Sequence, residues 1–67
     1  MTPEQMQSYA AHYGAKLPDM KNTHFWDGYK YKPVEHIIKW GWSYTFGQFN
    51  ALVRFPDGVE CWTYPRP

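Results

Sequence analysis

The sequence is poor in cysteine and in long apolar runs, and each shortage excludes a class of protein. Cys61 is the only cysteine among 67 residues, so no disulfide can form within the chain. No apolar run approaches the roughly 20 residues that a membrane-spanning helix needs. The beginning of the chain lacks the basic residues and apolar stretch of a signal peptide. We therefore expect a soluble, cytoplasmic protein that does not act at a membrane.

The sequence also lacks an excess of charge of either sign. Seven Lys and Arg face six Asp and Glu, which gives a formal net charge of +1. A balance this even produces no strong field to attract nucleic acid, and it does not make the chain an acidic mimic of DNA. Charge alone therefore indicates no partner.

Aromatic residues, in contrast, are abundant: four Trp, six Tyr and four Phe make up 21% of the chain. A chain of 67 residues has room for one domain, here residues 1–67, and buries only about 60% of its unfolded surface. Because each ring buries about 150–250 Å², aromatic side chains can build a core that smaller residues could not. Rings left at the surface would be favoured contacts for a partner.

The clearest local pattern is a helix over residues 2–14. Thr2 is a suitable N-cap, Pro3 is favoured at the first helical position, and Gln5 has the capping-box spacing from Thr2. Gly14 is well placed to end the helix in a left-handed conformation. One apolar stripe recurs at helical spacing: Met6, Tyr9, Ala10 and Tyr13.

The middle of the chain leaves alternatives open. Residues 15–24 indicate a connection, and Asp27-Gly28 between the short aromatic runs of residues 25–31 is typical of a hairpin. In residues 33–39 the apolar spacing favours a short helix that begins at Pro33, although the same stretch could extend the following strand.

From residue 40 onward the alternation predicts three antiparallel strands. A two-residue turn at Gly47-Gln48 would pair Phe46 with Phe49, and a loop at residues 56–58 would pair Phe55 with Val59. This register places two sets of side chains on opposite faces. The apolar set is Trp40, Trp42, Tyr44, Phe46, Phe49, Ala51, Val53, Phe55, Val59 and Cys61, and the mostly polar set is Ser43, Thr45, Asn50, Leu52, Arg54, Glu60, Trp62 and Tyr64.

The predicted fold is therefore α+β. The N-terminal helix packs on the apolar face of a three-stranded antiparallel meander, and the middle segment adds a short helix or a hairpin. In this register Arg54 lies opposite Glu60, and Leu52 lies opposite Trp62.

No pattern indicates catalysis, a metal or another cofactor. Ser8 and Ser43 lie outside any nucleophile motif. Cys61 falls on the apolar face, where a cysteine acts as a small apolar residue, and its spacing from the three histidines does not fit zinc. We expect a protein that is not an enzyme.

Protein binding is the function that the sequence favours. The polar face has an apolar centre with a polar rim, a common arrangement at interfaces. The expected partner-binding residues are Arg54, Trp62, Tyr64, Leu52 and Glu60, with Trp26 and Tyr29 beside the Asp-Gly turn as a second set. The alternative is that the middle segment covers Trp62 and Tyr64 to form a second small core.

Further alternatives concern the kind of partner. Aromatic rings on a sheet can stack bases, so binding of single-stranded RNA or DNA remains the alternative function. The outer strand, residues 59–64, could pair with another chain, and a homodimer is one possible result. In length and composition the chain is like the small proteins of phages and mobile elements, many of which inhibit a larger host protein by docking on it.

Overall fold

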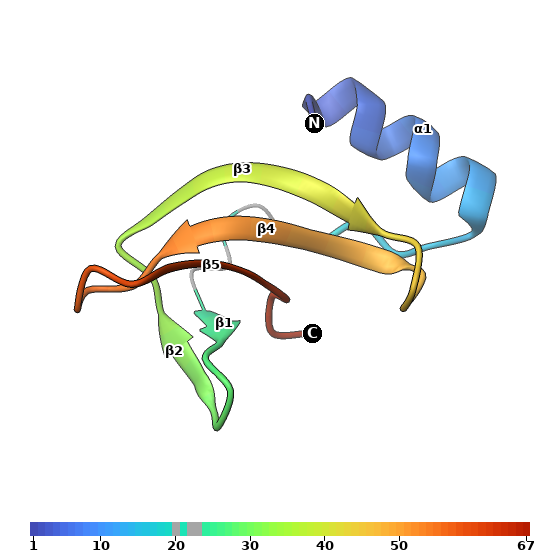
Figure 1. The fold of residues 1–67 in the computed structure, drawn as a ribbon. Coiled ribbons are helices and arrows are strands. Elements are labelled where there is room, and N and C mark those ends of the chain that lie inside the picture. The colour runs from blue at the N-terminus through green and yellow to red at the C-terminus, as the bar shows by residue number, and fades with distance from the viewer. Residues whose placement is uncertain (20, 22–23) are drawn as a thin grey trace.

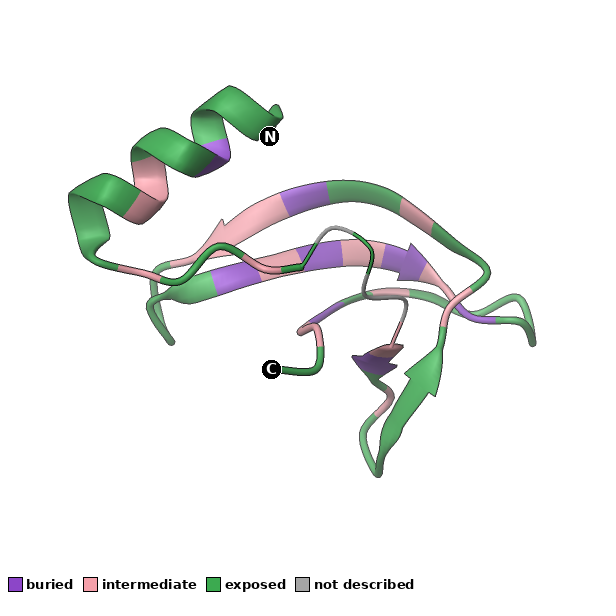
Figure 2. Cartoon of the chain, turned by 180° about the vertical axis from the view of Figure 1, so that it is seen from behind, coloured by how far each residue is buried: buried purple, intermediate pink, exposed green. Residues whose placement is uncertain are grey.

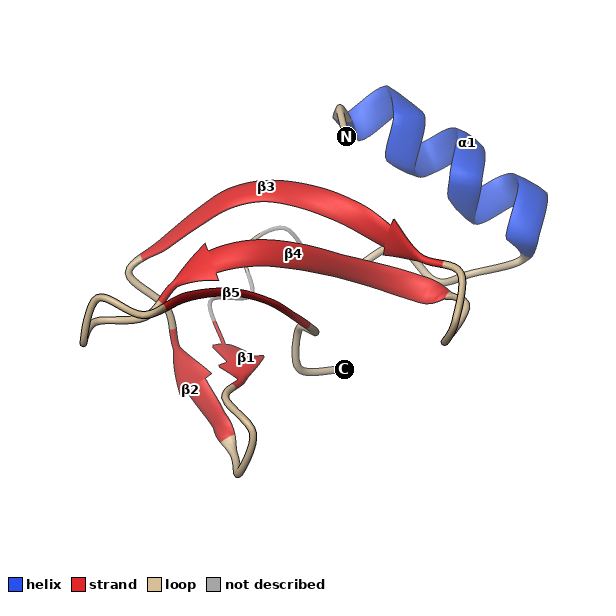
Figure 3. Ribbon diagram, viewed as in Figure 1, coloured by secondary structure: helices blue, strands red, loops and turns tan. Residues whose placement is uncertain are grey.

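The computed structural model describes residues 1–19, 21 and 24–67. β3, β4 and β5 form an antiparallel meander, and β1 and β2 form a two-stranded hairpin (Figure 3). The predicted α+β architecture is confirmed, with a hairpin in the middle segment. Along the chain (Figure 1) the elements are α1 (Pro3–Tyr13), β1 (His24–Trp26), β2 (Tyr31–Pro33), β3 (His36–Ser43), β4 (Gln48–Arg54) and β5 (Glu60–Thr63).

Helix α1 forms as the capping signals predict. The Gln5 N–H donates to Thr2 Oγ1 at 3.2 Å, while Gln5 Oε1 accepts from the Thr2 N–H at 2.9 Å. Gly14 ends the helix in the left-handed region at φ 66°. Of the apolar stripe, Met6 is buried, and Tyr13 stacks on Trp42 with 5.0 Å between ring centroids. The helix is thereby fixed to the end of β3.

The connection after α1 is shorter than predicted, because β1 begins at His24. Part of that predicted connection, residues 20, 22 and 23, lies outside the described residues. The hairpin at Asp27-Gly28 is confirmed. The Asp27 carboxylate accepts the N–H groups of Tyr29 and Lys30, both at 2.8 Å, and Gly28 adopts a φ of 108°.

The short helix favoured for residues 33–39 is wrong, because β3 begins at His36. A bulge at residue 38 explains the misleading pattern. Ile37 pairs with Val53, but the next regular pair is Lys39 with Leu52, so one residue is extra. The bulge separates the inward-facing Ile37 and Trp40 by three residues, which imitates the spacing of a helix.

The register predicted for β3 and β4 is also wrong, by four residues. Trp42 pairs with Phe49 instead of Val53, and the chain reverses through a four-residue turn, Tyr44–Gly47. Gly47 ends this turn at φ 63°, and Ser43 Oγ accepts the Phe46 N–H at 3.3 Å. An even shift keeps every paired side chain on its predicted face. Tyr44 and Phe46, however, leave the sheet and are 71% and 67% exposed.

The predicted pairing of β4 with β5 is confirmed. Leu52 lies opposite Trp62 and Arg54 lies opposite Glu60. The Phe55 N–H donates to the Val59 carbonyl at 2.9 Å, which closes the turn at residues 56–58. Val59 was expected on the apolar face, but it belongs to this turn instead of β5 and is 53% exposed.

The core lies on one face of the meander, which we call the inner face. Both α1 and the hairpin cover it, since Met6 and Phe25 are buried there with the strand residues (Figure 2). Phe25 is fully buried and packs on Trp40 at 5.8 Å between centroids. The buried apolar residues are Met6, Phe25, Trp40, Phe49, Ala51, Val53 and Phe55.

The two sheets are joined by residues 64–66, which follow β5 and pair with β1. The Trp26 N–H donates to the Tyr64 carbonyl at 3.0 Å, and the Arg66 N–H donates to the His24 carbonyl at 2.9 Å. Pro65 faces Phe25 between these two bonds, where its missing N–H costs nothing. The edge that the sequence offered for strand addition is thus partly occupied by β1.

Candidate docking surface

The face of the meander opposite the core carries most of the predicted partner-binding residues. Because side chains alternate along a strand, the residues between the buried positions of β4 and β5 project away from α1 and the hairpin. We call the surface that they form, together with its extension onto the hairpin, the outer surface. It consists of Lys39, Gly41, Ser43, Phe46, Asn50, Leu52, Arg54, Glu60, Trp62, Tyr64, Trp26 and Tyr31.

The extension onto the hairpin follows from the pairing of β1 with the tail. Because Pro65 lies opposite Phe25, Tyr64 lies opposite Trp26, and opposed residues share a face. Trp26 in turn lies opposite Tyr31, and their rings meet edge to face at 5.1 Å. The structure therefore places Trp26 on the same surface as Tyr64 and Trp62, a proximity that no pattern in the sequence indicates.

Trp62 lies at the centre of the meander part, flat across β4. A Cβ atom at Gly41 would come within 2.8 Å of the Trp62 ring and within 2.8 Å of Asn50 Oδ1. Only glycine therefore leaves room for the indole on β3. The ring covers Asn50, whose Oδ1 is buried and has no hydrogen-bond partner among the residues that the structure describes. Trp62 itself is 49% exposed.

The Tyr64 side chain also crosses β4, two residues further along the chain than Trp62. Its hydroxyl lies 3.2 Å from Ser43 Oγ on β3, and its ring meets Phe46 edge to face at 5.6 Å. Tyr64 is half-buried, while Phe46 remains largely exposed. The middle segment therefore does not cover Trp62, whereas Tyr64 is half-buried and lies beside Trp26 of that segment.

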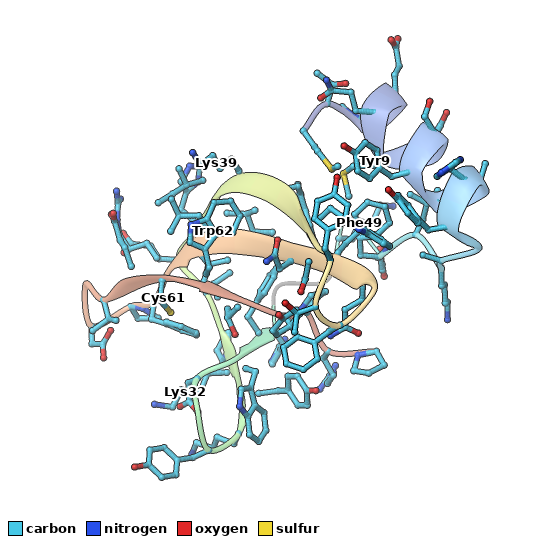
Figure 4. The ribbon with its side chains drawn as sticks, turned by 45° about the vertical axis from the view of Figure 1, so that its right-hand side comes forward. Tyr9, Lys32, Lys39, Phe49, Cys61 and Trp62 are labelled. Atoms are coloured by element: carbon cyan, nitrogen blue, oxygen red, sulfur yellow. The ribbon has the colours of Figure 1, made fainter. Side chains whose placement is uncertain are left out.

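Charged groups border the aromatic rings. Arg54 Nε donates to Glu60 Oε2 at 2.7 Å, and this ion pair raises the pKa of Arg54. The ammonium of Lys39 lies over the Trp62 ring, 5.6 Å from its centroid (Figure 4). Leu52 is half-buried between Lys39 and Trp62 in the middle of the sheet.

Tyr29 stands apart from the outer surface at the tip of the hairpin and is 91% exposed. Contacts of the Asp27 carboxylate stabilise the turn that carries Tyr29. Asp27 Oδ2 lies 2.8 Å from Lys32 Nζ, and this contact, with the two backbone N–H groups on Oδ1, holds the pKa of Asp27 far below its usual range. The position of the exposed Tyr29 side chain therefore depends on the hairpin and not on the meander.

Sequence reasoning missed four residues of the outer surface. Lys39 was assigned to a helix and Phe46 to the apolar face. Tyr31 could have been found, because hairpin pairing around Asp27-Gly28 places it opposite Trp26. The need for glycine at residue 41 gave no signal, since it depends on how Trp62 lies across two strands.

The described part of the chain holds no group of three or more His, Cys, Asp or Glu side chains placed to bind a metal ion. Within that same part, no helix is long and apolar enough to cross a membrane. Cys61 is partly buried against the core.

An open groove of about 770 Å³ lies elsewhere, between the connection after α1, the turn before β4 and the C-terminal tail. Its charged lining includes Lys16, Asp19, Lys21 and Arg66. None of the predicted partner-binding residues lines it. The outer surface and this groove are therefore separate features.

Comparison of the chain with protein family models, curated proteins and solved structures finds no match.

Proposed function

We propose that this chain is a non-enzymatic protein-binding module that docks on a larger protein through its outer surface. The observation that carries the proposal is the exposure of Trp62, Trp26, Tyr31 and Phe46, which are 49%, 39%, 38% and 67% exposed. At about 150–250 Å² per ring, these four side chains alone present roughly 400 Å² of aromatic surface. A contiguous patch of this size on a small monomer is commonly functional.

The arrangement of the rings supports the same proposal. Trp62 and Tyr64 lie flat across β4, each supported by a residue of β3, so little conformational freedom remains to be lost on binding. The Arg54–Glu60 pair lies toward the edge and supplies a polar rim. Rigid central aromatics within a polar rim are the usual composition of an interface hot spot.

Docking of this kind gives the chain two modes of action. It either blocks a functional surface of the larger protein, as an inhibitor, or joins that protein to another, as an adaptor. The inhibitor mode requires only the outer surface, whereas the adaptor mode requires a second contact surface, and we favour the inhibitor mode because it needs the fewer contacts.

The alternative function, binding of single-stranded RNA or DNA, also draws on exposed rings. Its weakness is charge. A nucleic-acid track needs several cations along the backbone of the strand, whereas Arg54 is neutralised by Glu60 and Lys32 by Asp27.

The test is a pull-down from host lysate with the tagged chain, with and without nuclease, at low and high salt. We expect a stoichiometric protein band that survives both treatments. The band should be absent with Trp62→Ala and present with Tyr44→Ala. Tyr44 is a matched control, because it is 71% exposed but lies in the turn beside Tyr13. A bound fraction that nuclease or salt removes would instead favour the nucleic-acid function, and no bound fraction would contradict both.

A further inference from the structure

The charges on the outer surface are unequally paired. Arg54 and Glu60 neutralise each other at 2.7 Å. Lys39 forms no ion pair with any residue that the structure describes, and its ammonium lies over the Trp62 ring (Figure 4). The charge without an ion-pair partner on the meander part of the outer surface is therefore positive, and it lies beside the Trp62 ring.

A partner that covers Trp62 must also remove water from Lys39, whose Nζ is only 5.6 Å from the ring centroid. Burying an ammonium without a counterion is costly. The carboxylate of Glu60 is already bound to Arg54. The compensating negative charge must therefore come from the partner.

The side chains around Lys39 indicate which other chemical groups the partner needs. Leu52 and the Trp62 ring adjoin the ammonium on one side, and the row formed by Tyr64, Trp26 and Tyr31 continues from there. Such surfaces accept apolar or aromatic side chains. An anionic group and an apolar group at adjacent positions of one polypeptide would satisfy both requirements.

We propose that the outer surface binds an acidic polypeptide segment, in which an Asp or Glu carboxylate pairs with Lys39 while a neighbouring apolar side chain covers Trp62. This inference rests on the proposed function and names the chemistry of its partner. A phosphate backbone is disfavoured, because Lys39 is a single cation on the outer surface without an ion pair among the described residues, and Arg54 is already paired with Glu60, so the surface has no basic track.

The experiment is selection of random twelve-residue peptides, displayed on a carrier, against the immobilised full chain. Parallel selections use Lys39→Gln, the charge reversal Lys39→Glu, Trp62→Ala and the matched control Lys16→Gln. Lys16 is an exposed lysine in the connection after α1 and lies off the outer surface. Circular dichroism first establishes that each variant is folded.

We expect the native chain to select peptides with Asp or Glu next to an apolar residue. A synthetic peptide of that consensus should bind Lys39→Gln about tenfold more weakly, as for loss of an interfacial charge pair, and should bind Lys16→Gln normally. Lys39→Glu should select Lys or Arg in place of the acid.

Two results separate the proposals. In the first, the selected peptides need Trp62 but show no preference for Asp or Glu, and they bind Lys39→Gln as well as the native chain. This result would overturn the proposal of an acidic partner and leave the proposal of the docking surface intact. Peptides whose binding is unaffected by Trp62→Ala would overturn both. Tight binding of a dT15 oligonucleotide that depends on Trp62 and Lys39 would overturn the inference in favour of nucleic acid.

Discussion

The two faces of the β3–β4–β5 meander are both rich in aromatic residues, yet they use them differently. On the inner face, Trp40 and Phe49 are 8% and 3% exposed, because α1 and the hairpin lie over them. On the outer face, Trp62 is 49% exposed and lies against its own sheet. The same residue type stabilises the fold where another element covers it and remains available to a partner where none does.

The largest expected effect comes from making the same substitution on each face. Trp40→Ala should cost about 3–5 kcal/mol, enough to unfold a domain this small, because it leaves a large cavity in the core. Trp62→Ala should cost only about 1–2 kcal/mol, because half of the ring is already in water. Urea unfolding followed by circular dichroism measures both. Equal losses would show that Trp62 belongs to the core.

A second change moves the exposed ring without removing it. In Gly41→Val the new side chain would overlap the Trp62 ring and Asn50, so the indole must lift from the sheet. We expect a loss of about 1–3 kcal/mol, as for other overpacked sites. The Trp62 indole N–H resonance should shift, while that of Trp40 should stay in place. An unchanged Trp62 resonance would contradict the close packing described above.

The turn of the β1–β2 hairpin should respond to acid before the meander does. The lowered pKa of Asp27 means that its ionised form is stabilised in the folded chain. This contribution is complete above the unfolded value of about 4 and is lost as pH falls below it. Protection of the Tyr29 and Lys30 amides against exchange, relative to their intrinsic rates at each pH, should therefore fall at low pH before protection at β4 does.

The matched variant for this effect is Asp27→Asn, which keeps an acceptor but cannot pair with Lys32. It should show lower protection of the Tyr29 and Lys30 amides at neutral pH, and little further loss of protection at those two amides on acidification. Protection at Tyr29 that stayed constant down to pH 2 in the native chain would argue against a role for the carboxylate.

The smallest expected effect concerns the polar atom beneath Trp62. Asn50 Oδ1 is buried without a hydrogen-bond partner in the described part of the chain, so it loses its hydration with no compensation. Asn50→Val removes that atom and favours the strand, and we expect a gain of about 0.5 kcal/mol in the free energy of unfolding. A loss above 1 kcal/mol would show that the amide has a structural role.

Local signals explain how much of the fold the sequence predicts. The helix is predictable because Thr2, Gln5 and Gly14 each perform a capping role within one turn of their partners. The β4–β5 register is predictable because the Pro56-Asp57-Gly58 turn fixes it. Such features depend on residues that are close together in the sequence, so they can be predicted from the sequence alone.

The failures arise where several segments decide together. The bulge at Ile38 is set by pairing with β4, and it gave residues 33–39 the spacing of a helix. Trp26 and Tyr64 come together only through the irregular pairing at Pro65, which carries no strand signal. Both groups of candidate residues could thus be identified from the sequence, but their proximity in the fold could not.

The pairing of β1 with residues 64–66 also makes the outer surface depend on two segments that lie far apart in the sequence. The Trp26 N–H donates to the Tyr64 carbonyl, and the Arg66 N–H donates to the His24 carbonyl. Loss of these two bonds would release the hairpin from the end of β5 and divide the outer surface into two smaller patches, one around Trp62 and one around Trp26. Any ligand that spanned both patches would hold the two segments together, and would stabilise the fold as it binds.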